Sequence, residues 1–373
     1  MKKTLLAAAL IAGFAGVAQA ETSVTLYGIV DGGIGYQQFK GNDIKATRTG
    51  TLSGGQSSSR WGLKGTEDLG EGLKAVFVLE NGFDLGTGVT SQDGKLFGRQ
   101  STVGLLSDAW GQLDFGRQTN IATKYFAGVA SPFGTDWSQA QIGTAFSAAG
   151  SQRYDNMVMY QTPNFAGFQF GLGYSFNANG SQAFKTSNSD EPNVRAWTTG
   201  LRYGNGPLAA ALTYDQFKSA ETGANVKGDT GVTVKSWNIG ASYDFEVVKL
   251  HLGFGQTRNG WFAAPSALNS KVAGQDQFSS MIAEDGVKIN SYALGLSAPV
   301  GANGKVLAGW TMADLRDNGN GDSGRKQQVY SLGYSYALSK RTNVYAIGSY
   351  ANHVAFSDDL KSTFVGAGVR HQF

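Results

Sequence analysis

The chain has 373 residues, a formal net charge of +3 and no cysteine. The lack of cysteine excludes disulfides and thiol or zinc–thiolate chemistry, and the nearly balanced charge gives no general basis for binding nucleic acid. Glycine supplies 53 residues, about twice the usual share, but 22 Phe, 15 Tyr and 7 Trp exclude a disordered glycine-rich chain.

The first predicted element is a secretory signal peptide over residues 1–20. Lys2 and Lys3 precede an apolar stretch from Leu5 to Val17, and Ala18-Gln19-Ala20 is a small-x-small cleavage site. The apolar stretch is shorter than the roughly 20 residues that a spanning helix needs. We therefore expect export of the protein and a mature chain of residues 21–373.

Alternation of bulky apolar residues with small or polar residues predicts β-strands through the rest of the chain. Phe168 to Phe176 is representative, because its even-numbered residues are bulky and its odd-numbered residues are Gln, Gly and Ser. The small, polar face cannot pack a dry core, so we expect it to face water while the bulky face contacts lipid. Sixteen strands are predicted near 23–37, 57–69, 72–83, 96–107, 110–118, 152–163, 166–177, 194–204, 207–217, 231–245, 248–258, 288–299, 304–315, 326–338, 341–352 and 361–373.

The connections between these strands alternate in length. Short turns such as Leu69–Gly72 and Gly204–Pro207 alternate with long segments, including those near 38–56, 119–151 and 259–287. Short turns at one rim, long loops at the other and an even number of strands are typical of outer-membrane barrels. The sequence thus predicts an all-β, 16-stranded antiparallel transmembrane β-barrel, as a single domain over 21–373.

The last strand alternates strictly from Thr363 and ends on an aromatic residue, Phe373. A terminal strand of this kind, in an exported chain, indicates the closing strand of a barrel. We expect it to pair with the strand that begins near Ser23.

Several segments resemble Gram-negative general diffusion porins, especially those of beta-proteobacteria. The clearest is Ser59–Ala75, which is similar to the second hairpin of that family, and shorter similar stretches are Val24–Gly28, Phe115–Gln118, Tyr160–Phe168 and His371–Phe373. The ordered set extends over essentially the whole mature chain. The resemblance implies a homotrimer in the outer membrane of a Gram-negative bacterium, surrounded by outer-membrane lipid.

The same resemblance implies a passive function. Ions and small hydrophilic solutes would diffuse through a water-filled channel, with no cofactor. The third long loop, about 119–150, would fold inward as a constriction loop, and Phe373 would be read by the barrel-assembly machinery as an assembly signal.

Six charged residues are candidates for the pore constriction. Arg60, Arg99 and Arg153 match the arginine cluster of related porins, and Lys64 shares the small, polar strand face with Arg60. Glu80 matches a lumen glutamate of the family. The turn Ser131–Asp136 departs from the family pattern because it has no internal glutamate, so Asp136 is its nearest acid. Three or four cations against two acids predict an anion-leaning pore.

Other interpretations of these features remain open. Each arginine could be a solvated rim residue, and the barrel could be a substrate-specific channel for sugars or organic acids. Long polar loops also fit a surface barrel that acts mainly as an adhesin or receptor. The three histidines, His251, His353 and His371, do not lie in catalytic motifs, so no enzyme is expected. The acids between Asp314 and Asp322 lack a calcium-loop pattern, so no metal site is expected.

Overall fold

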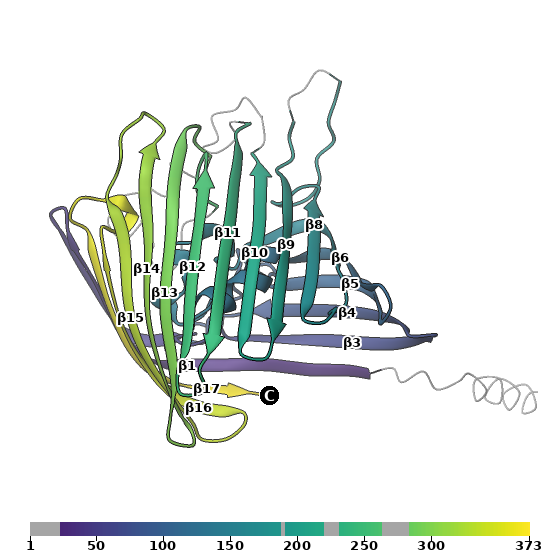
Figure 1. The fold of residues 1–373 in the computed structure, drawn as a ribbon, viewed down its shortest axis with the longest axis horizontal. Helices are drawn as coiled ribbons and strands as arrows, with labels where there is room; N and C mark the ends of the chain where they lie inside the picture. Colours follow the sequence, from purple (N-terminus) through teal and green to yellow (C-terminus); the bar gives the residue numbers. More distant parts are fainter. Residues whose placement is uncertain (1–22, 188–190, 220–230, 263–282) are drawn as a thin grey trace, which may run out of the picture.

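The computed structural model of the chain describes residues 23–187, 191–219, 231–262 and 283–373. The predicted signal peptide therefore lies outside the described residues. The described chain forms one antiparallel β-sheet that curls on itself (Figure 1). Its strands are β1 (Ser23–Gly41), β2 (Ile44–Ser53), β3 (Arg60–Gly70), β4 (Leu73–Gly82), β5 (Gln100–Ser107), β6 (Gly111–Thr119), β7 (Arg153–Gln161), β8 (Phe168–Ser175), β9 (Arg195–Asn205), β10 (Leu208–Lys218), β11 (Thr233–Asp244), β12 (Lys249–Arg258), β13 (Val287–Val300), β14 (Gly304–Asn318), β15 (Lys326–Ala337), β16 (Thr342–Asn352) and β17 (Lys361–Gln372).

The sheet closes into a barrel because β1 pairs on both of its edges. On one edge it pairs with β17 from Ile29 to Lys40. On the other edge β2 and then β3 follow one another, with Ser53 opposite Gly32 and Arg60 opposite Ile29. Thus β2 and β3 are two parts of one strand that is interrupted at 54–59. The seventeen segments therefore form a closed barrel of sixteen antiparallel strands, which confirms the predicted fold.

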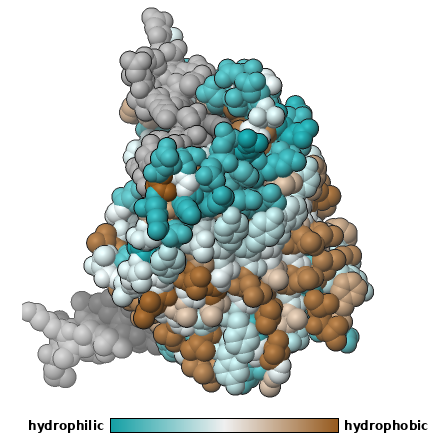
Figure 2. Space-filling model, turned by 90° about the vertical axis from the view of Figure 1, so that its left-hand side faces the viewer, coloured by the Kyte–Doolittle hydropathy of each residue, from teal (hydrophilic) through white to brown (hydrophobic). Residues whose placement is uncertain are grey.

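The two faces of the strands have the predicted chemistry. On β11, Trp237 and Ile239 are 38% and 49% exposed, whereas Ser236 and Asn238 are 1% exposed. Figure 2 shows hydrophobic residues gathered over the lower part of one side of the barrel, with hydrophilic residues above them. Because apolar side chains line the outside and polar ones the inside, the barrel matches a wall that meets lipid outside and water inside.

The prediction of a long loop over 38–56 is wrong. β1 continues to Gly41, a tight turn at Asn42 and Asp43 has positive φ at both residues, and β2 returns immediately. The turn conformation suits Asn and Asp, whose short side chains tolerate this region. The outer face of β2 carries Lys45, Thr47, Thr49 and Thr51 instead of bulky apolar residues, so the alternation that marks the other strands is missing here.

Between β6 and β7, residues 120–150 consist of short helical turns, and we refer to them as the 120–150 segment. These are η1 (Ala122–Phe126), α2 (Ala127–Ala130), η2 (Ser138–Ala140), η3 (Ile142–Thr144) and η4 (Ser147–Ala149), and a further turn, η7 (Val354–Phe356), lies between β16 and β17. Among the described residues, no helix is long and apolar enough to cross a membrane.

Candidate functional site

The six predicted charged residues come together around one cavity of about 1320 Å³ within the barrel. They come from different elements, so the closed sheet and the 120–150 segment assemble the site jointly. Arg60 and Lys64 lie on β3, Glu80 on β4, Arg99 directly before β5, Asp136 in the 120–150 segment and Arg153 at the start of β7.

Glu80 is the centre of the charged contacts. It accepts a hydrogen bond of 2.7 Å from Arg99 Nε and one of 3.0 Å from the Tyr27 hydroxyl, while Arg60 Nε lies 4.0 Å away. The strand pairing explains this convergence, because Gly62 of β3 lies directly opposite Glu80. A Cβ atom on Gly62 would lie 2.9 Å from the Tyr27 hydroxyl, so the glycine leaves the space through which Tyr27 reaches the carboxylate.

Two of the cations are held by neutral groups. Arg153 Nε donates to the Arg99 carbonyl at 3.1 Å, and its Nη1 donates to the Ser151 carbonyl at 3.1 Å. Lys64 Nζ lies 5.4 Å from the centre of the Tyr27 ring, a cation–π distance. Within the described part of the chain, neither Arg153 nor Lys64 forms an ion pair with a carboxylate. Their positive charges are therefore held in place without being cancelled.

Asp136 is linked to Arg370 through the Ser57 hydroxyl group. Ser57 Oγ donates to its carboxylate at 3.4 Å and accepts a hydrogen bond of 3.1 Å from Arg370 Nε. Burial raises the pKa of Asp136, and the nearby charges of Arg60, Arg99 and Arg370 oppose that rise without cancelling it. The second acid of the site is thus a half-buried carboxylate near several cations.

The 120–150 segment packs against the inner, polar face of the opposite wall. Trp137 contacts Tyr345 of β16 at 5.7 Å between ring centres, and its backbone N–H donates to the Gln56 carbonyl at 2.8 Å. Glycines permit the close approach: a Cβ atom on Gly295 would lie only 2.3 Å from Pro132 Cδ. At the start of the segment, the Asn120 amide donates to Asp215 of β10 at 2.7 Å. These contacts fasten the segment at its start and in its middle.

Other charged and polar residues of the cavity were not predicted from the sequence. Tyr27, Arg48, Asp93 and Arg341 also line it, and Arg370 reaches it through Ser57. Tyr27 alternates in step with Thr25 and Ile29, which also line the cavity, so strand parity would have placed it on the inner face. Arg48 lies on β2, which lacks the alternation of the other strands, and the positions of Asp93 and Arg341 depend on loop conformation.

Phe373 lies at the seam of the barrel. Its backbone N–H and carbonyl both pair with Gly28 of β1, each at 3.1 Å. A Cβ atom on Gly28 would lie 2.5 Å from the aromatic ring, so the glycine makes room for the ring. The last residue therefore completes the pairing of β17 with β1.

The described residues contain no metal-binding cluster, and their histidines make local contacts. No group of three or more His, Cys, Asp or Glu side chains comes close enough to hold a metal ion there. His251 contacts the Val129 carbonyl and His371 contacts the Thr342 hydroxyl, at 2.9 and 2.8 Å. These contacts fix the imidazole rings without forming an acid–His–nucleophile arrangement.

Comparisons with known proteins agree with this architecture. A family profile described as Gram-negative porin matches residues 7–354. The chain is 54% identical to an outer membrane porin protein of Bordetella pertussis and 34% identical to outer membrane porin protein 32 of Delftia acidovorans, in both cases over the full length of both chains. Its fold is similar to that of the anion-selective porin from Comamonas acidovorans, with a TM-score of 0.72 and 30% identity over 95% of this chain and 100% of the other.

Proposed function

This chain belongs to the Gram-negative porin family, and from that premise we propose that its charged cavity makes it an anion-preferring diffusion channel. Its place in the outer membrane and its passive channel function follow from the barrel and from its relatives. Beyond this general channel function, we propose that small hydrophilic anions are the favoured solutes and that the protein has no catalytic role.

The single observation that carries the proposal is the imbalance of charge around the cavity. Six cationic side chains line it, against three acidic side chains. The cations are Arg48, Arg60, Lys64, Arg99, Arg153 and Arg341, and the acids are Glu80, Asp93 and Asp136. An excess of one sign along a water-filled pore raises the local concentration of ions of the other sign. The name of the Comamonas porin, which is anion-selective, agrees with this direction.

We assign the role of constriction loop to the 120–150 segment. It brings Asp136 to the lining of the cavity, near the positive charges of Arg60 and Arg99, and we propose that these acidic and basic side chains face one another across the passage. Such an arrangement produces a transverse field that orients water and polar solutes. The contacts of Trp137 and Pro132 with the opposite wall would keep the passage at a fixed width.

The experiment is a reversal-potential measurement in planar bilayers under a potassium chloride gradient. We expect chloride to permeate faster than potassium in the wild-type channel, and Arg60→Gln to lower that preference. Arg258→Gln is the matched control, because Arg258 is an exposed arginine outside the cavity lining. A wild-type channel that prefers potassium, or a channel that one sugar blocks specifically, would contradict the proposal.

Assembly is proposed from the family alone. Members of the porin family form trimers, so we propose a homotrimer in contact with outer-membrane lipid, and Phe373 as the signal read by the barrel-assembly machinery. Supporting the last point, Phe373 completes the seam between β17 and β1. Chemical cross-linking of the membrane-extracted protein tests the trimer. Cross-linked products no larger than a dimer would contradict it.

A further inference from the structure

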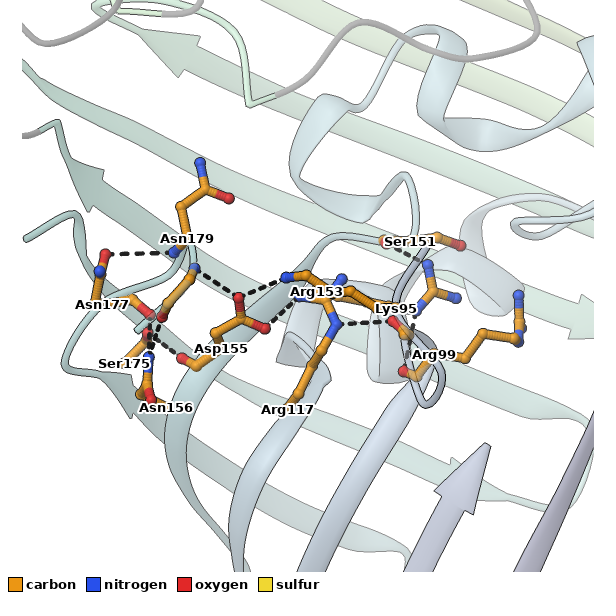
Figure 3. Close-up of polar contacts among 12 residues, drawn as sticks. Lys95, Arg99, Arg117, Ser151, Arg153, Asp155, Asn156, Ser175, Asn177 and Asn179 are labelled. Carbon is orange, nitrogen blue, oxygen red and sulfur yellow. Dashed lines mark hydrogen bonds and ion pairs between the residues drawn. The ribbon is translucent and has the colours of Figure 1, made fainter. Parts of the chain in front are cut away.

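Asp155 of β7 connects two loops at the long-loop rim of the barrel. Its carboxylate accepts hydrogen bonds from Arg117 Nη1 at 2.6 Å, from Lys95 Nζ at 2.7 Å and from the backbone N–H of Gly180 at 2.7 Å. Figure 3 shows Lys95 and Arg117 approaching Asp155 from one side, with Asn177 and Asn179 of the loop that follows β8 on its other side. The carboxylate therefore joins β6, the loop before β5 and the loop after β8.

Arg117 extends this network to the backbone beside Arg99. Its guanidinium bonds Asp155 through Nη1 and donates to the Gly98 carbonyl through Nε, at 2.7 Å. The next carbonyl along the chain, that of Arg99, accepts from Arg153 Nε at 3.1 Å. Two successive carbonyl groups are thus fixed by arginines of β6 and β7. The Arg99 side chain leaves the backbone at this point and reaches Glu80 at 2.7 Å.

We propose that Asp155 and Arg117 are positioning residues, which set the ion preference of the channel by holding the backbone that carries Arg99. This inference rests on the proposed function, since it assumes that Arg99 acts on permeating anions. Neither Asp155 nor Arg117 lines the cavity, so they act on ions through the placement of Arg99. Lys95 contributes to the same carboxylate from within the loop.

The geometry of the contact explains why arginine and a carboxylate are needed. The Asp155 side chain is 13% exposed and the Arg117 side chain 17% exposed, so each charge depends on the other in partly dry surroundings. Arginine presents several N–H donors in a fixed plane and can bond a carboxylate and a carbonyl at once. Lysine keeps the charge but cannot hold both groups in that fixed geometry.

Two substitutions separate positioning from a simple effect of charge. Asp155→Asn removes a negative charge near the mouth, so a purely electrostatic role would raise the chloride preference. If Asp155 positions Arg99, the same change releases Arg117 and Gly98 and lowers the preference. Arg117→Lys leaves the net charge unchanged, so electrostatics alone predicts no effect, whereas loss of positioning again predicts a fall.

The test measures the chloride-to-potassium permeability ratio of the full barrel in planar bilayers. We expect Asp155→Asn and Arg117→Lys each to lower the ratio by about fivefold, the factor that corresponds to the loss of one ordinary hydrogen bond's contribution at Arg99. Asp93→Asn is the charge-matched control, because Asp93 itself lines the cavity, and we expect it to raise the ratio. Only barrels that migrate as folded protein on unheated gels are reconstituted.

A second measurement tests the accessibility of the loop before β5 to protease. Trypsin should cleave after Lys95 faster in Arg117→Lys than in the wild type, because the released loop becomes accessible, and mass spectrometry identifies the fragment. The inference is overturned if Asp155→Asn raises the ratio as Asp93→Asn does, or if Arg117→Lys changes neither the ratio nor the cleavage rate. A wild-type channel without anion preference would instead refute the proposed function, while faster cleavage would still show that Arg117 holds the loop.

Discussion

Replacing Glu80 with glutamine provides a quantitative test of the electrostatic account of the pore. Glu80→Gln removes one negative charge and keeps the size of the side chain. In the structure the carboxylate lies 2.7 Å from Arg99 Nε and 4.0 Å from Arg60 Nε, so it partly cancels two of the cations that face the passage. Its removal should therefore strengthen the positive field at the place where the ions pass.

The size of the effect follows from Coulomb's law. A chloride ion passing about 5 Å from the carboxylate in a water-like medium is repelled by about 0.8 kcal/mol. Screening at 0.1 M salt, with a Debye length of about 10 Å, reduces this to about 0.5 kcal/mol. The substitution lowers the barrier for chloride and raises the barrier for potassium by similar amounts. The permeability ratio should therefore increase about fivefold, which corresponds to a total of about 1 kcal/mol.

The assay is the reversal potential across a bilayer, measured in dilute and in concentrated potassium chloride. At 1 M salt the Debye length is about 3 Å, so we expect the increase to shrink to less than about twofold. Glu67→Gln is the control, because Glu67 is exposed on β3 and does not line the cavity. An unchanged or lower ratio in Glu80→Gln would refute the reasoning, as would an increase of equal size in Glu67→Gln.

Three further predictions concern the second acid, the 120–150 segment and the seam. Because burial raises the pKa of Asp136, its carboxylate should gain a proton at a higher pH than an ordinary aspartate. Acidification should therefore raise the chloride preference of the wild type but not that of Asp136→Asn. The same pH dependence in both channels would contradict this prediction. Gly295→Ala places a methyl group 2.3 Å from Pro132 Cδ, so single-channel conductance should fall as the 120–150 segment is displaced. The control Gly348→Ala meets no heavy atom within 4 Å and should leave the conductance unchanged. Equal conductances of the two variants would show that the contact between Gly295 and Pro132 does not set the width of the passage. Deleting Phe373 removes two backbone hydrogen bonds to Gly28, so less folded barrel should reach the membrane, while Phe373→Tyr should assemble normally; full assembly of the truncated chain would argue against the seam's role.

The fold could be predicted from the sequence because its determinants are local. Alternation over segments such as Phe168–Phe176 reports which side chains meet lipid, and each strand carries that pattern within itself. This local pattern is missing where the outer face is polar, at Thr47, Thr49 and Thr51 of β2. There the strand is specified by its pairing with β1, which a local pattern does not reveal.

The charged site was predictable only in part. Strand parity placed Arg60 on the small, polar face of its strand, and the family resemblance made Glu80 of the next strand a lumen residue. Within one hairpin, sequence distance and spatial distance are both short. Lys95 and Asp155 are 60 residues apart, and their contact depends on how the loop after β4 folds over β6 and β7. No spacing in the sequence indicates that meeting, so the network behind Arg99 required the three-dimensional structure.

The structure separates the charges that act on ions from the charges that hold the fold. Arg153 is satisfied by the carbonyls of Arg99 and Ser151, which are neutral acceptors that fix the guanidinium and leave its charge available to the passage. Arg117 is paired with the carboxylate of Asp155, which also accepts a hydrogen bond from Lys95, and neither Arg117 nor Asp155 lines the cavity. A carboxylate in place of either carbonyl would hold Arg153 equally well but would weaken the field. The choice of acceptor, rather than the number of arginines, therefore determines how strongly each cation contributes to anion preference.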